Sequence, residues 1–195
     1  PVRCLPGQAS ALLRLKRSFT TTDESVAAFH SWKAGTDCCH WEGIRCSATT
    51  GRVTSLDLGD SGLESDHLDH VLFELNSLRY LNLGGNDFSL SEIPSPGFEQ
   101  LTRLTHLNLS NSKFAGQVPA YSIGCLTNLV SLDLSSYSEI TEWYDHTHMI
   151  RVHFDQLILP NLTGLVANLT SLRELHLGWV DMFGQGEEWC SALAN

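Results

Sequence analysis

The chain has 195 residues, enough for one ordinary domain or a short repeat array with an apolar core of useful size. Hydrophobic residues make up 42% and charged residues 17%, a globular balance, and no apolar run approaches the roughly 18 residues that a membrane span needs. The net charge of -10 repels phosphate backbones and anionic lipid headgroups, so we expect no nucleic-acid partner and no membrane contact by this segment.

The first predicted elements are two short helices. Residues 8–19 place apolar side chains roughly on one helical face, and residues 26–32 repeat the pattern over a shorter stretch. The apolar positions are Ala9, Leu12, Leu13 and Phe19 in the first helix and Val26, Phe29 and Trp32 in the second. Each predicted helix therefore has an apolar face that must pack against another part of the protein.

Four of the six cysteines lie early in the chain, at Cys4, Cys38, Cys39 and Cys46, and predict a disulfide-bonded segment. Vicinal cysteines rarely bond each other because the ring is strained, which leaves two of the three connectivities. Of these we favour Cys4–Cys38 with Cys39–Cys46. Disulfides are typical of secreted proteins. A zinc site of His40 with three thiolates is the alternative, but the usual spacing is missing and we expect no metal.

A Leu-x-x-Leu-x-Leu pattern then recurs five times. Its middle leucines are Leu56, Leu81, Leu107, Leu132 and Leu175, at steps of 25, 26, 25 and 43 residues. The Leu-x-Leu alternation places both leucines on one face of a short strand, and parallel stacking of such strands buries them in a continuous core. A leucine heptad would need a different spacing.

The predicted fold class is therefore α/β, a right-handed leucine-rich-repeat solenoid with short parallel strands on its concave face. A solenoid exposes its first leucine layer unless a cap covers it. We assign residues 1–52 to an N-terminal, disulfide-bonded helical cap and residues 53–195 to about five repeats.

One polar position recurs three residues after the last leucine of a repeat. Asn86 occupies it in the second repeat and is expected to bond the backbone of the adjoining turns, while Ser61 and Ser112 hold the place in the neighbouring repeats. Tyr137 and Val180 break the pattern. We therefore expect the fourth and fifth repeats to be less regular.

The 43-residue step indicates an insertion at roughly 137–160. It holds a group of aromatic, histidine and acidic residues: Trp143, Tyr144, Asp145, His146, His148, His153, Phe154 and Asp155. Their spacings match no metal-ligand motif. Two interpretations stay open: an ordered loop that covers the solenoid flank, and a protruding arm that contacts a partner.

Three stretches resemble a known family. Residues 37–46 (DCCHWEGIRC), followed by residues 51–58 (GRVTSLDL), resemble the N-terminal cap and first repeat of plant leucine-rich-repeat receptor-like proteins. Residues 114–119 (FAGQVP) are similar to the F-x-G-x-I/V-P turn of plant-type repeats, and residues 168–190 resemble the disease-resistance members of grasses.

This resemblance implies a secreted chain, or one on the extracellular side of the plasma membrane, that senses a ligand in defence or development. It implies a protein, peptide or wall-derived ligand, with a co-receptor kinase as a further partner. The resemblance leaves the partner of Cys190 open, and the state of Cys125 is open as well.

The concave face is the expected binding surface, because its side chains are not consumed by core packing. Its outward residues form a polar, acidic strip with a few aromatic anchors, which is typical of a protein or peptide docking surface. The candidate ligand-binding residues are Asp57, Tyr80, Asn82, His106, Asn108, Asp133, Glu174, His176 and Trp179. The alternative is a solvated strand face without a partner.

Three Asn-x-Ser/Thr tripeptides predict glycan acceptors at Asn108, Asn161 and Asn168. A glycan on Asn108 would stand on the proposed binding surface.

The sequence lacks a G-x-S-x-G elbow, a phosphate-cradling glycine loop and an HExxH motif, so we expect neither an enzyme nor a cofactor. The predicted function is an extracellular recognition module of a receptor-like protein. The alternative is a secreted leucine-rich-repeat inhibitor of a cell-wall-degrading enzyme, similar to plant polygalacturonase-inhibiting proteins. An ice-binding surface would need regular ranks of Thr or Asn, and the outward residues are too varied for that.

Overall fold

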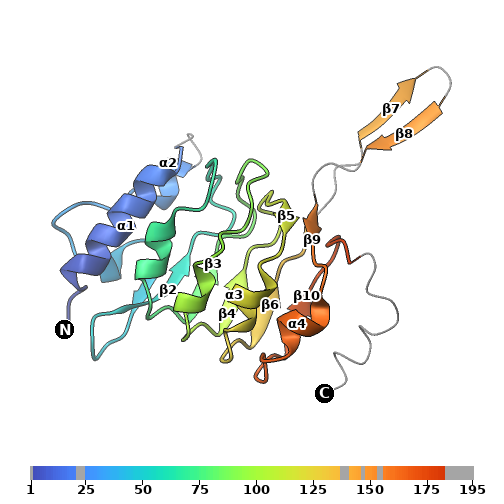
Figure 1. Ribbon diagram of the computed structural model, residues 1–195. Coiled ribbons are helices and arrows are strands. Elements are labelled where there is room, and N and C mark those ends of the chain that lie inside the picture. The colour runs from blue at the N-terminus through green and yellow to red at the C-terminus, as the bar shows by residue number, and fades with distance from the viewer. Residues whose placement is uncertain (1, 21–24, 137–140, 146–147, 153–155, 183–195) are drawn as a thin grey trace.

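The computed structural model describes residues 2–20, 25–136, 141–145, 148–152 and 156–182. Short strands and turns stack along one direction, from the helical N-terminal cap to the last repeat (Figure 1). The chain folds as the predicted leucine-rich-repeat solenoid.

One six-stranded sheet runs the length of the stack in the order β1-β2-β3-β4-β6-β10. The strands are β1 (Ile44–Cys46), β2 (Val53–Asp57), β3 (Tyr80–Asn82), β4 (His106–Asn108), β6 (Ser131–Asp133) and β10 (Glu174–His176). The last five pair in parallel, and their middle leucines fall in a single register row. Each repeat therefore adds one strand to the sheet and one leucine layer to the core.

The core is as continuous as the repeat pattern predicts. Leu56, Leu81, Leu107 and Leu132 are at most 1% exposed. Leu81, Leu107 and Leu132 have a leucine layer on both sides, and Leu56 lies between Ile44 of the cap and the layer of Leu81. The leucines of the fifth repeat, Leu172, Leu175 and Leu177, are only half-buried and pack at the edge of the same cluster. They form the last layer of the described solenoid.

Strand β1 is antiparallel to β2, which the prediction of parallel strands missed. Only residues 47–52 separate the two strands, a connection too short for a parallel crossover. β1 therefore covers the first edge of the parallel sheet with a strand of the cap.

The first predicted helix is present as α1 (Pro6–Ser18). It begins with proline at a position where the missing N–H costs nothing, and it ends with Lys16 and Arg17 near the negative end of its dipole. Its buried face includes Leu12 and Leu15. The Gln8 Oε1 accepts a hydrogen bond of 2.7 Å from the Val53 N–H, which ties the helix to the first repeat strand.

The second predicted helix is wrong in its extent. Helix α2 (Ser25–Ala28) has only four residues, and Val26 is 55% exposed. Phe29 and Trp32 are buried as expected, but they lie in the turns that follow. The reason is that aromatic packing, and not a helical stripe, holds them.

A chain of aromatic rings connects the cap to the repeats. Successive ring centroids lie 4.4–6.2 Å apart along Trp41, Trp32, Phe29, Phe19, Phe88 and Phe114. Two indole N–H groups in this chain are satisfied: Trp32 Nε1 donates to the Glu42 carbonyl and Trp41 Nε1 donates to the Thr36 hydroxyl. The aromatic chain thus buries large apolar surfaces without stranding a polar group.

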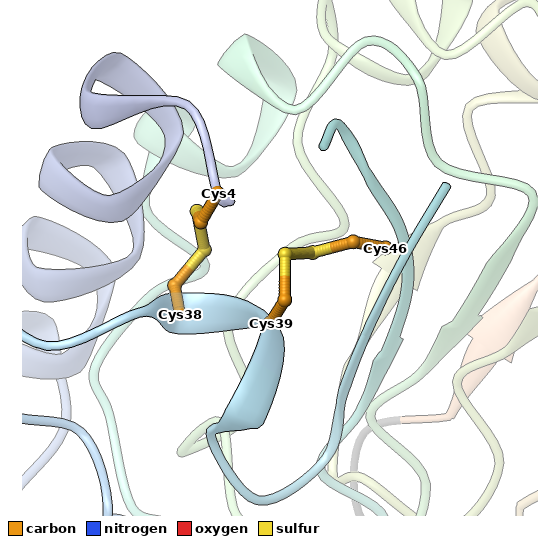
Figure 2. A group of neighbouring side chains, drawn as sticks. All are labelled: Cys4, Cys38, Cys39 and Cys46. Atoms are coloured by element: carbon orange, nitrogen blue, oxygen red, sulfur yellow. A yellow bond between two sulfur atoms is a disulfide. The ribbon is translucent and has the colours of Figure 1, made fainter. Parts of the chain in front are cut away.

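Disulfides join Cys4 to Cys38 and Cys39 to Cys46, the connectivity favoured from the sequence, with Cα atoms 5.5 and 5.4 Å apart. Figure 2 shows the first linking the start of α1 to the short helical turn η1 (Cys38–His40), and the second linking that turn to β1. The four sulfur atoms lie close together, but each is bonded to another sulfur. Their bonding leaves no thiolate for the zinc alternative.

Asp37 organises the same turn. Its Oδ1 accepts hydrogen bonds from the backbone N–H groups of Cys4 (3.0 Å) and Cys39 (3.1 Å). These bonds favour the carboxylate form and hold the pKa of Asp37 below its ordinary value. The carboxylate thereby holds the backbone of one cysteine from each disulfide.

Short helical turns cover the side of the stack away from the sheet. They are η2 (His70–Glu74), η3 (Phe98–Gln100), α3 (Ala120–Gly124) and α4 (Leu162–Val166). Helix α1 packs on η2, with an ion pair between Arg14 and Glu74, and α3 packs on η3 and α4.

The predicted insertion contains three strands. β7 (Thr141–Asp145) and β8 (His148–Val152) form an antiparallel hairpin that stands away from the stack in Figure 1. β9 (Leu157–Ile158) returns to the solenoid and pairs in parallel with β5 (Gly116–Gln117). His146, His153, Phe154 and Asp155 lie outside the described residues.

Asn86 makes the backbone bonds expected from the repeat pattern. Its Nδ2 donates to the carbonyl oxygens of Leu58 (2.8 Å) and Leu83 (2.7 Å), and its Oδ1 accepts from the Leu63 N–H (3.0 Å). The Ser112 hydroxyl also donates to the Leu83 carbonyl. In the fifth repeat the buried Val180 cannot do this, and Tyr137 lies outside the described residues.

Replacing Asn86 by Ala is expected to lower the free energy of unfolding by about 3 kcal/mol, because the Leu58 carbonyl and the Leu63 N–H lose their partner, whereas the Leu83 carbonyl keeps the Ser112 hydroxyl. Urea unfolding measures the loss. Ser61→Ala is the matched control, since its half-buried hydroxyl makes one bond of 3.3 Å within its own turn, and it is expected to cost less than about 0.5 kcal/mol. Equal losses in the two variants would contradict this role of Asn86.

The two disulfides are expected to differ in strength. The Cys4–Cys38 bridge spans 34 residues and the Cys39–Cys46 bridge spans 7. Double serine variants are expected to lose about 4 kcal/mol for the first bridge and about 2.5 kcal/mol for the second, because the longer loop restricts the unfolded chain more. Chemical unfolding of both variants under oxidising conditions tests the order, and a larger loss for the short bridge would refute it.

Candidate recognition surface

The parallel register arranges the outward side chains of the sheet in two rows. The first row consists of Ser55, Tyr80, His106, Ser131 and Glu174, and the second row consists of Asp57, Asn82, Asn108, Asp133 and His176. The leucine row lies between them and faces the core. Eight of the nine candidate residues therefore lie in two straight lines on one face, although they are spread over 120 positions of sequence.

The second row is largely engaged in its own backbone. In Asp57, Asn82, Asn108 and Asp133 the Oδ1 atom accepts a hydrogen bond from the backbone N–H two residues further on, at 2.8–3.4 Å. Asn82 Nδ2 also donates to Asp57 Oδ1 at 2.9 Å. These are Asx turns, and they bend the chain away at the end of each strand.

These four outward side chains are not consumed by core packing, but they do stabilise the local backbone. A three-residue strand must end abruptly in every repeat. The side-chain oxygen of a short residue at its last position accepts a hydrogen bond from a backbone N–H that has no strand partner. The spacing of leucines in the sequence does not reveal this second use.

Small residues follow the second row for the same reason. A Cβ atom on Gly59 would lie 2.3 Å from Asn82 Nδ2, and one on Gly84 would lie 3.0 Å from Asn108 Oδ1. Each asparagine packs over the glycine of the preceding repeat. The side chains of the second row thus form a ladder in which Asn82 and Asn108 each pack against the preceding repeat.

The side chains of the first row are less engaged in bonds to the backbone. Tyr80 is half-buried and His106 is exposed, with ring centroids 6.0 Å apart. His106 Nδ1 lies 2.9 Å from the Thr105 hydroxyl. Burial, followed by the nearby charge of Asp57, raises the pKa of Tyr80 above its ordinary value, so the phenol stays neutral. This pair offers an amphipathic aromatic contact in the middle of the sheet.

The fifth repeat offers the most exposed candidates. Glu174 and His176 on β10 are exposed, and Trp179 in the turn after β10 is 56% exposed with a left-handed backbone φ of 62°. A large indole is the type of side chain that dominates protein interfaces.

A hollow of about 510 Å³ lies at the junction of the cap and the first repeat. Its lining includes Glu42, Arg45, Ser55, Asp57 and Asp60, so it is mainly acidic and joins the start of both rows. Arg45 and Asp60 were not among the predicted site residues, because β1 was not predicted and Asp60 follows the repeat strand.

The three predicted glycan acceptors differ in their surroundings. Asn161 and Asn168 are exposed, and Asn161 Oδ1 caps α4 by accepting from the Gly164 N–H at 2.7 Å. Asn108 is half-buried and packs over Gly84. Cys125 is half-buried and unbonded, and Cys190 lies outside the described residues.

Comparison with known proteins decides the family. Residues 5–47 match the family described as "Leucine rich repeat N-terminal domain" and residues 77–101 match "Leucine Rich Repeat". Receptor-like protein 6 of Arabidopsis thaliana is 35% identical over 92% of this chain and 18% of its own length, and receptor-like protein 7 is 39% identical over 91% and 17%. The chain belongs to the plant leucine-rich-repeat receptor-like proteins.

The chain spans less than a fifth of the length of these curated relatives. It carries the cap and the first repeats of a receptor-like protein, as the residue motifs indicated. Within the described residues no helix is long and apolar enough to cross a bilayer. The specific likeness of residues 168–190 to grass members stays a prediction.

Solved structures share the architecture. A chain of the BIR3–SERK2 complex from Arabidopsis thaliana has a TM-score of 0.69 at 26% identity, over 89% of this chain and 82% of that chain. A plant ice-binding protein has a TM-score of 0.67 at 24% identity, over 93% of this chain and 50% of that chain, which shows the fold alone.

The two rows are expected to respond differently to truncation. Asn82→Ala removes the Asx turn and the bond to Asp57, so we expect a loss of about 1–2 kcal/mol in the free energy of unfolding. His106→Ala, on the neighbouring strand of the first row, is expected to stay within about 0.5 kcal/mol of the parent. Urea unfolding measures both, and an Asn82→Ala variant as stable as the parent would show that the ladder is not structural.

Proposed function

We propose that this chain is an extracellular recognition module of a plant cell-surface receptor-like protein, and that it binds a protein or peptide ligand across the concave face. The observation that carries the proposal is the first row, which is aligned on a sheet whose second row is largely held by Asx turns. Because much of this surface is already held in place, few groups lose conformational freedom when a ligand binds, and binding there costs little conformational entropy.

The chemistry of the surface suits a polypeptide. The Tyr80–His106 pair supplies aromatic groups in the middle of the sheet, and the exposed Trp179 follows the last strand in the next turn. Buried aromatic anchors within a polar surround are typical of protein interfaces. The acidic residues at the first end, Glu42 and Asp57, favour a ligand that is basic there.

A second leucine-rich-repeat ectodomain is a natural partner for such a module. The BIR3–SERK2 structure is a complex, and one of its chains shares this fold at 26% identity. For this chain we propose a co-receptor kinase as the further partner, in line with the family resemblance. The exposed residues of the fifth repeat, Glu174, His176 and Trp179, are the proposed contact region.

The alternative function, a secreted inhibitor of a cell-wall-degrading enzyme, would use the same face. The relatives that match most of this chain are named receptor-like proteins, which favours the receptor module. Extracellular placement also suits the two disulfides and the exposed Asn161 and Asn168 acceptors.

The test screens the whole chain, immobilised, against secreted plant and microbial proteins and peptides by biolayer interferometry. We expect a ligand whose affinity falls by about 30-fold in a Tyr80→Ala/Trp179→Ala variant, the usual size of a hot-spot loss. Tyr121→Ala is the matched control, because this tyrosine is 83% exposed but lies on α3.

Ligands whose affinity drops with Tyr121→Ala, and not with the Tyr80/Trp179 double variant, would refute the concave site. A ligand that proves to be a wall-degrading hydrolase, and that is inhibited on binding, would replace the receptor module by the inhibitor.

A further inference from the structure

A second hollow lies at the edge of the sheet where the strands begin, and it shares no residue with the nine candidates of the concave face. Its volume is about 600 Å³. Arg52, Arg79 and Arg103 line it, and they come from three successive repeats. Arg52 directly precedes β2, Arg79 directly precedes β3, and Arg103 lies in the turn before β4. The three guanidinium groups therefore gather in one place only because the repeats stack.

The charge of this hollow is the opposite of that of the whole chain. Acidic residues outnumber Lys and Arg by 22 to 12, yet among the described residues no carboxylate lines the hollow. Elsewhere in the described part of the chain, Arg14 pairs with Glu74 and Lys113 pairs with Asp87. The three arginines are exposed and form no ion pair with a described residue. Their mutual repulsion is therefore uncompensated until an anion enters.

The rest of the lining consists of hydroxyl groups. They belong to Ser47, Thr49, Thr50, Thr54 and Ser77. Ser47 Oγ and Thr49 Oγ1 lie 3.0 Å apart, and Ser47 Oγ also accepts from the Thr50 N–H. Each hydroxyl can both donate and accept a hydrogen bond. The lining contains no aromatic ring and no long aliphatic side chain that would suit an apolar ligand.

The walls of the hollow are held in place. The Ser47 N–H donates to the Arg52 carbonyl at 2.8 Å, which closes the loop between β1 and β2. Gly51, in the left-handed region at φ 66°, packs so closely on the chain start that an added Cβ would lie 2.0 Å from the Arg3 carbonyl oxygen. The Cys39–Cys46 disulfide anchors the preceding strand. Such a preformed site loses little entropy when a ligand binds.

The base of the central arginine is fixed as well. The Arg79 N–H donates to the Thr54 carbonyl at 2.8 Å, and the Arg79 carbonyl accepts from the Thr105 N–H and the Thr105 hydroxyl. Only its side chain is left to move. A guanidinium fork presented in this way matches the two oxygens of a carboxylate.

We infer that this hollow binds an acidic oligosaccharide, a chain of sugar rings that carry carboxylates. Successive carboxylates pair with arginines of successive repeats, and the ring hydroxyls bond the serine and threonine hydroxyls. An acidic peptide offers the same charge but fewer hydroxyl partners, so the lining favours the sugar. The site is independent of the concave face and adds a second ligand class to the chain.

The test is isothermal titration of the whole chain with a purified oligomer of galacturonic acid, beside the same oligomer with its carboxylates methyl-esterified. We expect binding of the acidic form, weakening as salt is added, and at least about tenfold weaker binding of the esterified form. Arg79→Gln is expected to weaken binding of the acidic form by about tenfold, and Arg79→Lys by less, because the charge remains while the fork is lost.

Arg173→Gln is the matched control. Arg173 precedes β10 as Arg79 precedes β3, and its N–H makes the corresponding backbone bond, but it does not line the hollow. We expect it to leave the affinity unchanged. Equal urea midpoints for the exposed-arginine variants verify that the fold is intact.

Three results would overturn the proposal. One is equal binding of the esterified and acidic oligomers. Another is an equal loss of affinity in Arg173→Gln and Arg79→Gln. The third is a glutamate peptide of the same charge that binds as tightly as the sugar, which would assign the hollow to acidic peptides.

Discussion

The structure depends on one constraint: the middle leucines of five strands must fall in the same register row. A shift of one residue would turn each leucine to solvent and each polar residue into the core. Because every repeat obeys this register, the core is continuous and the outward residues become aligned in rows. The proposed binding surface thus arises as the outer face of the packed sheet, without a dedicated domain.

The same repetition also requires some of the surface side chains for turn formation. A strand of three residues must end and turn in every repeat, and the second row supplies the side-chain oxygens that stabilise those turns. One row is therefore scaffold and the other is available for recognition. This division explains why asparagine and aspartate recur at the second position, whereas the first row varies from serine to tyrosine, histidine and glutamate.

The cap does more than cover the first leucine layer. Through β1 it extends the sheet, through the aromatic chain from Trp41 to Phe114 it enters the core of the repeats, and through the loop at residues 47–52 it completes a hollow lined by arginines. An acidic hollow and a basic hollow consequently lie near opposite ends of the first strands. The first repeats hold two surfaces of opposite charge in a receptor-like protein fold.

The sequence by itself determined the repeats, the cap, the favoured disulfides and the Asn86 bonds, because all of these follow from spacing within one repeat or from cysteine chemistry. It also identified which side chains point outward. The tertiary structure alone decided that β1 is antiparallel, that Phe29 and Trp32 pack from turns, and that Asp57 and Asn82 are engaged in Asx turns. It alone brought Arg52, Arg79 and Arg103 together. The antiparallel β1, the aromatic packing and the arginine cluster depend on contacts between segments that are separated in the sequence, and the Asx turns depend on local backbone geometry. Hydrophobic periodicity carries no information about either.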